Sequence, residues 1–206
     1  MKPLFTTLAT GLMLLGCTAT YAASTVDLTV KGLIVPSACT PSLSGGGVID
    51  HGKISAKDLK TDNPTLIGTH TLSMVVSCDS AITFALHSVD NRAGSSMFPS
   101  NYGLGLINGN QKLGWFHLRL DNPLADGVAV QAIASVNGQD NWYSEKLWDP
   151  GLYMSVASMA DDTQPVPAKD LSLELVIQTS IARTDGLDLS NEVTLDGSAT
   201  LEVKYL

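Results

Sequence analysis

Alternating apolar and polar residues recur along most of this chain, and they predict β-strands. Successive side chains of a strand point to opposite faces, so a period of two indicates a strand with one buried face. The longest clean alternation covers residues 171–181, and another covers residues 72–78 and ends at a cysteine. Shorter apolar runs predict further strands at residues 26–30, 82–86, 104–107, 113–120, 128–136 and 152–156.

A further strand pattern occupies residues 193–206. Its apolar face consists of Val193, Leu195, Ala199, Leu201, Val203 and Tyr205. Its polar face carries Thr200, Glu202 and Lys204. Terminal residues are poorly ordered unless something holds them. The aromatic Tyr205, second from the end, therefore indicates a strand that completes a core. Two interpretations are open: an ordinary last strand of a sandwich, or a strand that an outside partner recognises.

Turn-forming residues separate these runs. Four dipeptides are typical of tight turns: Asn108-Gly109, Asp126-Gly127, Asn137-Gly138 and Asp185-Gly186. One short helix is expected at residues 55–59, where Ser55 is a suitable cap, and residues 45–47 and 164–167 are expected to be surface loops. About nine short strands separated by turns are typical of a β-sandwich. We therefore expect one all-β domain over residues 23–206.

The first residues have the layout of a secretory signal. Lys2 gives a short positive region, a mostly apolar stretch follows at residues 4–15, and small residues lead to Ala22. That stretch is too short for a membrane span. We expect residues 1–22 to be a signal peptide that is cleaved after Ala22. The alternative is a lipobox at residues 14–17, in which Cys17 would carry lipid and anchor the protein to a membrane. Either route takes the protein out of a bacterial cytoplasm.

Composition narrows the class of partner. The 206 residues include 44% hydrophobic and 16% charged residues, which excludes a disordered chain. The formal net charge of −8 at pH 7 argues against binding to nucleic acid or to anionic membrane surfaces. We therefore expect no nucleic-acid partner, and membrane attachment only if Cys17 is lipidated.

Two cysteines remain after Cys17 is removed with the signal or acylated. Cys39 and Cys78 would lie in an oxidising periplasm, where two thiols are expected to pair. A bridge around about 40 residues removes roughly 4 kcal/mol of freedom from the denatured chain in the chain-entropy model. No further His or Cys stands at metal-ligand spacing, so we expect a structural disulfide and neither a metal nor a cofactor.

The sequence offers few candidates for catalysis or ligand binding. The four histidines are scattered, and no nucleophile or zinc-protease motif is present, so we expect no enzyme. We expect Asp50-His51 to form a surface turn; the alternative is a catalytic dyad. We expect the acidic residues at 161–162 and 185–188 to lie in solvated turns; the alternative is calcium binding. Three tryptophans and one tyrosine are interpreted as buried anchors or, as the alternative, as a sugar-stacking surface: Trp115, Trp142, Trp148 and Tyr143.

The two ends of the chain, taken with the cysteines, resemble pilins assembled by the chaperone–usher route. The alternating residues 26–30 are followed by Gly32, seven positions before Cys39; Cys78 closes the next strand, and Tyr205 is penultimate. The Asp90-Asn91-Arg92 and Gly-Leu-Gly-Leu segments are also similar to an uncharacterised family of fimbrial-like secreted bacterial proteins.

The resemblance implies an immunoglobulin-like, pilin-type sandwich that is incomplete because it lacks its last strand. A periplasmic chaperone, and later the N-terminal segment of a sister fimbrial subunit, would fill the open groove by donor-strand exchange. It implies that Val26, Leu28 and Val30 are donor residues. It also implies that Leu201, Val203 and Tyr205 line the acceptor edge. An outer-membrane usher, a surface fimbria and a role in adhesion follow as expectations. The alternative is a free-standing periplasmic or secreted β-sandwich that binds a ligand.

Overall fold

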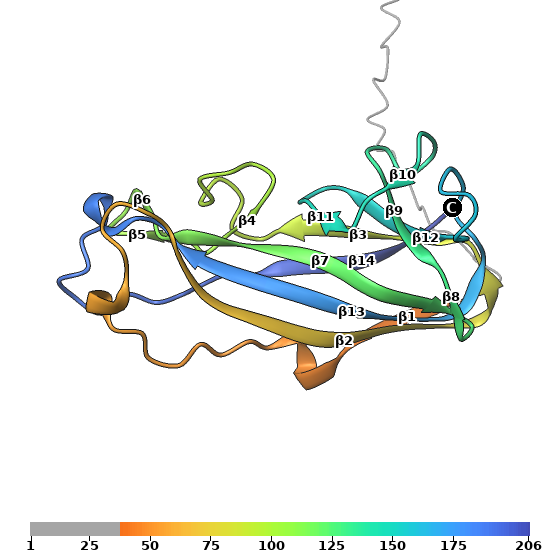
Figure 1. Ribbon diagram of the computed structural model, residues 1–206, viewed down its shortest axis with the longest axis horizontal. Coiled ribbons are helices and arrows are strands. Elements are labelled where there is room, and N and C mark those ends of the chain that lie inside the picture. Colours follow the sequence, from red (N-terminus) through yellow and green to blue (C-terminus); the bar gives the residue numbers. More distant parts are fainter. Residues whose placement is uncertain (1–37) are drawn as a thin grey trace, which may run out of the picture. The chain divides into compact units, whose positions relative to one another are not determined.

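Residues 38–206 are described by a computed structural model, in which antiparallel strands form an immunoglobulin-like β-sandwich (Figure 1). The fold is all-β, as the alternating pattern predicts, and helical structure within these residues is limited to three short 3-10 turns. These turns are Ser44–Gly47, Ala56–Asp58 and Thr184–Gly186. Within the same residues, no helix is long and apolar enough to cross a membrane.

The first sheet has the order β1-β2-β13-β7-β11, and β4 and β8 also pair with β7. Its strands are β1 Cys39–Leu43, β2 Thr65–Ile82, β4 Tyr102–Gly103, β7 Gly114–Ala125, β8 Val128–Ala129, β11 Leu147–Trp148 and β13 Ala168–Ile181. The long central strand β13 is the alternating segment that the sequence marks most clearly. It pairs with β2 on one side and with β7 on the other.

The second sheet has the order β10-β9-β12-β3-β14. Its strands are β3 Phe84–Asp90, β9 Gln131–Ser135, β10 Tyr143–Ser144, β12 Tyr153–Ala157 and β14 Ala199–Tyr205. A separate two-stranded hairpin joins β5 Leu106–Ile107 to β6 Gln111–Lys112. Its turn contains Asn108 and Gly109, both with positive φ (50° and 87°), which confirms the turn predicted from this dipeptide.

The core lies between the two sheets. Leu171, Leu173 and Leu175 of β13 are 2–4% exposed, as expected for alternate residues that face the opposite sheet. Tyr102 is fully buried and stacks on Phe116 with ring centroids 5.0 Å apart. Its hydroxyl lies 2.6 Å from Ser88 Oγ, so the one polar atom of this ring is hydrogen-bonded inside the core.

Three local expectations need correction. The helix expected at residues 55–59 is only the 3-10 turn Ala56–Asp58, and the Ser55 side chain makes no capping hydrogen bond. The single strand expected at residues 128–136 is divided into β8 and β9, which belong to different sheets. The last strand begins at Ala199 instead of residue 193. Val193 and Leu195 nevertheless pack against the core, so apolar alternation continues beyond the paired part of the strand.

Candidate functional site

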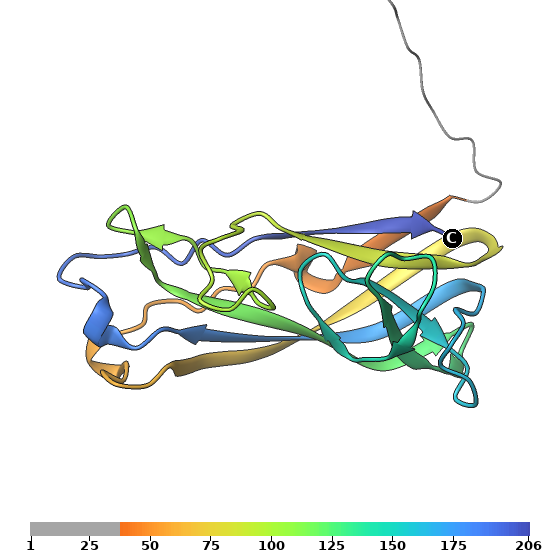
Figure 2. The ribbon, with the colours of Figure 1, turned by 90° about the horizontal axis from the view of Figure 1, so that it is seen from above.

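A groove lies between two strand edges on the same side of the sandwich. Strand β1 ends one sheet and β14 ends the other. Figure 2 shows both strands along one margin, at the end that holds the C-terminus, whereas β8 and β9 lie along the opposite margin. Within residues 38–206, β1 pairs only with β2 and β14 pairs only with β3. Each strand therefore has one edge without a strand partner among these residues.

The groove between these edges has a volume of about 270 Å³ and an aliphatic lining. Leu43 of β1, Leu72 of β2 and Leu201 of β14 line it and are only partly buried, although each packs against the core. Its deeper surface is formed by core residues, among them Leu118, Leu175 and Ile177, which are 2–5% exposed. The groove therefore opens directly onto the hydrophobic core.

The free edge of β14 presents backbone groups as well as apolar side chains. The amide of Asn91 donates to the Ser198 carbonyl, and the amide of Leu206 donates to the Thr83 carbonyl (3.0 and 3.2 Å). Because hydrogen-bonded pairs alternate in an antiparallel ladder, the even-numbered residues of β14 direct their N–H and C=O groups at β3. The odd-numbered residues 199–205 direct theirs toward the groove side, where an added strand would pair.

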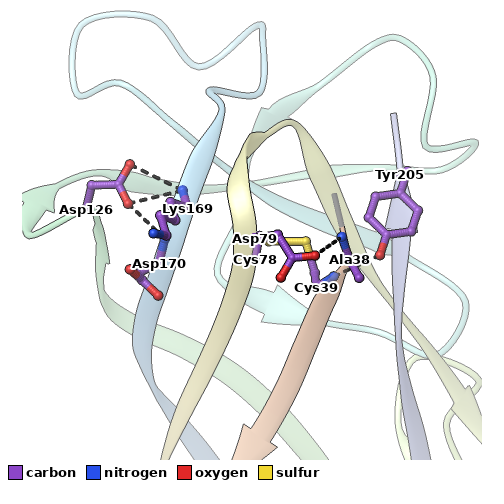
Figure 3. The surroundings of a disulfide bond; sticks show 8 residues. All are labelled: Ala38, Cys39, Cys78, Asp79, Asp126, Lys169, Asp170 and Tyr205. Atoms are coloured by element: carbon purple, nitrogen blue, oxygen red, sulfur yellow. Dashed lines mark hydrogen bonds between the residues drawn. A yellow bond between two sulfur atoms is a disulfide. The ribbon is translucent and has the colours of Figure 1, made fainter. Parts of the chain in front are cut away.

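At one end the two edges are held together around the disulfide (Figure 3). Cys39 and Cys78 form the predicted bridge between β1 and β2, where they are opposite each other in the register. The Cys39 amide donates to the Tyr205 hydroxyl at 2.9 Å, a contact that joins β1 to β14 across the two sheets. The Ala38 amide donates to the Asp79 carboxylate, and the Asp79 amide donates to the Ala38 carbonyl. The two edges are therefore joined by a hydrogen bond beside the disulfide, at the end of β1 opposite to Leu43, which lines the groove.

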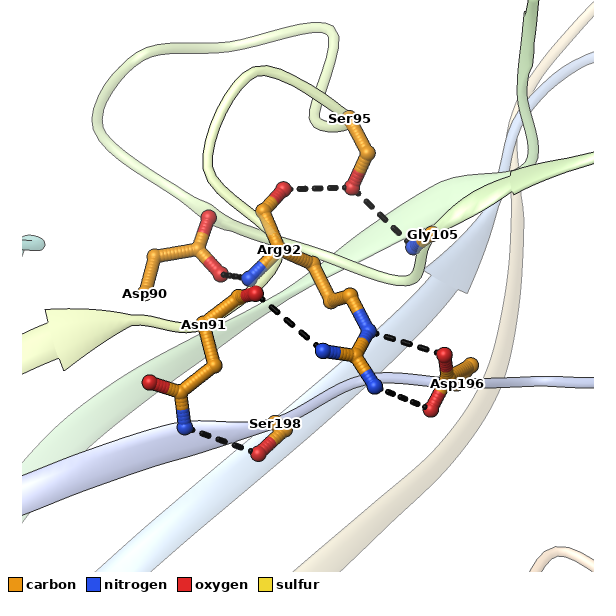
Figure 4. Close-up of polar contacts among 7 residues, drawn as sticks. All are labelled: Asp90, Asn91, Arg92, Ser95, Gly105, Asp196 and Ser198. Atoms are coloured by element: carbon orange, nitrogen blue, oxygen red, sulfur yellow. Dashed lines mark hydrogen bonds and ion pairs between the residues drawn. The ribbon is translucent and has the colours of Figure 1, made fainter. Parts of the chain in front are cut away.

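A polar cluster positions the segment that leads into β14 (Figure 4). Arg92 donates through Nε and Nη2 to the two carboxylate oxygens of Asp196, at 2.8 Å each. This pairing lowers the pKa of the Asp196 carboxyl, chiefly through the hydrogen bonds from Arg92. The side-chain amide of Asn91 donates to Ser198 Oγ and Thr200 Oγ1. The segment Asp90-Asn91-Arg92, which the sequence analysis notes, thus fixes one wall of the groove.

Gly197 in this wall has a steric reason to be glycine. A Cβ atom at this position would lie 2.8 Å from Leu104 Cδ2 and 3.0 Å from Phe116 Cε1. The main chain therefore lies directly on the core where it borders the groove. A side chain here would displace either the wall or the two core residues beneath it.

A second, wider hollow of about 670 Å³ borders the first, and the two share Ile49, His51 and Leu195. Its lining is more polar and includes Lys53 and Glu192. The half-buried His51 thus lies where the two hollows meet. Burial and the neighbouring His70 lower its pKa, and Asp50 opposes this effect. Most of the residues that line the first hollow are apolar, whereas charged and polar residues make up a larger share of the residues that line the second.

The structure places the predicted acceptor residues along this side of the sandwich. Leu201 lines the groove, whereas Val203 and Tyr205 are not among its lining residues. Val203 packs against the core, and the Tyr205 hydroxyl accepts from the Cys39 amide. The predicted donor residues Val26, Leu28 and Val30 lie outside the described residues. Sequence reasoning missed Leu43, Ile49, Leu72 and His51 as groove residues. Leu43, Ile49 and His51 all have odd numbers, which is a weak sign that they share one face of an extended chain. The glycines at residues 45–47 interrupt the pattern and obscure this sign.

The other candidate residues have structural explanations. The Asp50 carboxylate accepts from the Gly52 amide at 2.7 Å, and His51 Nε2 lies 3.1 Å from Thr179 Oγ1, so the two side chains have different partners. His51 is half-buried and lines the groove, so it does not lie in a simple surface turn. Asp161 and Asp188 each accept hydrogen bonds from the residue two positions later, and these bonds lower the pKa of both carboxyls. The three tryptophans are 1–8% exposed, as expected for buried anchors. Tyr143, at 42% exposure, is not a buried anchor.

Comparisons with known proteins identify similar chains. The profile of a family described as "Protein of unknown function (DUF1120)" matches residues 28–105. The protein named "Uncharacterized protein YhcF" of Escherichia coli K12 is 28% identical over 90% of this chain and 92% of its own length. "Protein GltF" of the same strain is 22% identical over 87% of this chain and 88% of its own length. The matched family segment includes both cysteines, strand β1 and the polar residues that position the wall of the groove.

Proposed function

We propose that this protein is a fimbrial-like structural subunit that is exported to the periplasm and assembled by donor-strand exchange. In this role a periplasmic chaperone first fills the groove, and a strand from a sister subunit replaces it at an outer-membrane usher. The product is a surface fibre that acts in adhesion. The protein acts as a building block and not as an enzyme.

The observation that carries this proposal is the groove between β1 and β14. It combines the two requirements for adding a strand to a sheet edge: backbone groups for main-chain pairing and depressions for alternate side chains. The outward-directed backbone groups of residues 199–205 meet the first requirement. The aliphatic lining, which includes Leu43, Leu72 and Leu201, meets the second.

The groove also explains why an isolated subunit would need a chaperone. An open strand edge above exposed aliphatic side chains invites pairing with other chains. Three consecutive glycines with positive φ, residues 45–47, form a 3-10 turn directly after β1 ends at Leu43, so the strand does not continue along the groove. The gap is therefore a consequence of how the chain continues after β1, and an inserted strand would close it.

The experiment adds a synthetic peptide, as a donor strand, to the purified protein of residues 23–206. The probe is a synthetic peptide with the sequence of residues 23–31, which supplies Val26, Leu28 and Val30 as alternating side chains. Binding to the folded state raises the melting temperature with peptide concentration by mass action. A control peptide with these three residues replaced by asparagine is expected to have no effect.

Two leucine variants localise the binding. Leu201→Glu places a charge in the groove and is expected to abolish the peptide effect. Leu147→Glu is the matched control, because this leucine is 47% exposed on β11 at the far edge of the first sheet. Tyr205→Ala should weaken capture by a co-expressed periplasmic chaperone. A stable monomer that ignores both peptide and chaperone would contradict the proposal and favour the free-standing binding module.

A further inference from the structure

Two half-buried histidines face each other beside the groove, and donor-strand assembly gives them no role. His51 belongs to the segment after β1, and His70 lies on β2. Their ring centroids are 4.9 Å apart and the ring planes are nearly perpendicular, at 82°. The pair therefore connects a segment that lies outside both sheets to a strand within the first sheet.

A glycine leaves space where the two rings meet. Gly68 lies two residues before His70 on β2, so the two positions share one face of the strand. A Cβ atom on Gly68 would lie 3.1 Å from His51 Nδ1 and 3.0 Å from His70 Nε2. One nitrogen atom from each imidazole therefore borders the same side-chain-free space.

The second nitrogen of His51 is already held. His51 Nε2 lies 3.1 Å from Thr179 Oγ1, and Thr179 is 3% exposed on β13, opposite Gly68 in the register. When Nε2–H donates to this hydroxyl, the lone pair resides on Nδ1, the atom beside Gly68. Histidines that bind metals are commonly oriented in this way, by a hydrogen bond from the nitrogen that does not bind the metal.

We propose that His51 Nδ1 and His70 Nε2 bind a divalent transition-metal ion of the class that prefers imidazole, with copper(II) bound more tightly than zinc(II). Imidazole nitrogens suit copper and zinc, whereas calcium and magnesium prefer oxygen ligands. Residues 38–206 contain no group of three or more His, Cys, Asp or Glu side chains placed for a metal. Water therefore completes the coordination, and the site is open, with modest affinity.

Such an ion would fix the wall of the groove. His51 lies on the segment 48–54, which belongs to neither sheet, and His70 lies on a strand paired with β13. Joining the two through a metal would hold this segment against β2. The inference is independent of donor-strand assembly, because a metal can bind whether or not a strand enters the groove.

The experiment titrates the exported protein with copper(II) after treatment with a chelator. Electron paramagnetic resonance is expected to show copper bound to imidazole nitrogen, and calorimetry is expected to show one ion bound per chain with modest affinity. His51→Ala and His70→Ala should each weaken binding by at least about tenfold, and Thr179→Val by about tenfold through loss of ring orientation. Zinc(II) should raise the melting temperature of the native protein but not of these variants.

Two further variants separate the site from other causes. Gly68→Ala keeps both histidines but fills the space between them, so it should weaken copper binding in a protein whose circular dichroism is native. His117→Ala is the matched control. His117 on β7 is also half-buried, but its ring is hydrogen-bonded to Gln178 on β13 and is not part of the His51–His70 pair. Copper affinity that is unchanged in His51→Ala and His70→Ala, or reduced equally in His117→Ala, would overturn the proposal.

Discussion

The sandwich has two sides where its sheets meet, and they differ in how they are closed. On the closed side, the chain itself passes from β7 through β8 to β9, so one continuous segment joins the two sheets. Val130, at the crossing, is 9% exposed and donates its amide to the Pro123 carbonyl at 3.1 Å. On the open side, β1 and β14 come from distant parts of the sequence, and the hydrogen bond that joins them within residues 38–206 is the one between Cys39 and Tyr205 at the disulfide end.

Aliphatic residues are present on both sides, so the groove does not arise from a lack of apolar side chains. Leu120 of β7 is 1% exposed on the closed side, whereas Leu201 of β14 remains partly buried on the open side. The Asp126 carboxylate at the β7–β8 turn accepts from the amides of Lys169 and Asp170, which further ties the closed side to β13 (Figure 3). Within residues 38–206, the open side therefore differs from the closed side in lacking a strand between its two edges.

The largest effect is expected from removal of the disulfide, because it fixes the one joined end of the open side. Replacing Cys39 and Cys78 by serine should lower the free energy of unfolding by about 4 kcal/mol, since the unfolded chain regains the freedom of the enclosed loop. Urea unfolding followed by tryptophan fluorescence measures this change. Native protein purified without reductant should contain no free thiol at either position, and titratable thiols there would contradict the expectation.

A matched pair of leucine substitutions then compares the two sides directly. Leu120→Ala should lower the free energy of unfolding by about 3 kcal/mol, because it leaves a cavity in a close-packed region. Leu201→Ala should cost only about 1 kcal/mol in the free protein, because its side chain is already partly in water. The same urea experiment in the presence of the residue 23–31 peptide should enlarge the cost at Leu201 alone. Equal costs without peptide would show that the open side is not open in solution.

Hydrogen exchange provides a residue-level measure of the free edge. The amides of Thr200 and Glu202 point toward β3 and should be protected, whereas those of Leu201 and Val203 point away and should exchange faster. Nuclear magnetic resonance resolves this alternation along β14. Added peptide should slow exchange at the odd-numbered amides without changing the even-numbered ones. Uniform protection of β14 in the free protein would indicate that its outer edge is already paired.

The sequence predicts the fold class and the disulfide because both depend on local signals. Alternation identifies β13 and the apolar face of β14, and once Cys17 is assigned to the expected signal peptide, Cys39 and Cys78 have one pairing available. The groove is harder to predict, because it depends on which strands become edges, and register and sheet order are non-local. The histidine pair illustrates the same limit. His51 and His70 are 19 positions apart and meet only because Gly68 leaves room between them.

The smallest effect is expected at Arg92, which shapes the open side without closing it. Arg92→Gln removes the paired hydrogen bonds to Asp196 but leaves the Asp196 amide free to donate to the Leu104 carbonyl. The ion pair is open to water, with 37% of the Arg92 side chain and 59% of the Asp196 side chain exposed, so global stability should change little. The wall beside Gly197 should instead become less ordered, and the residue 23–31 peptide should bind more weakly.

The ionic origin of this effect can be separated from other causes by pH. The pairing lowers the pKa of Asp196, so its contribution is present above the ordinary pKa of an aspartate and is lost as pH falls through the lowered value. Peptide affinity of the native protein should therefore approach that of Arg92→Gln only in strong acid. Arg119→Gln is the control, because Arg119 pairs with Asp121 on β7, away from the groove. If both variants weaken the peptide equally, Arg92 does not act through the groove wall.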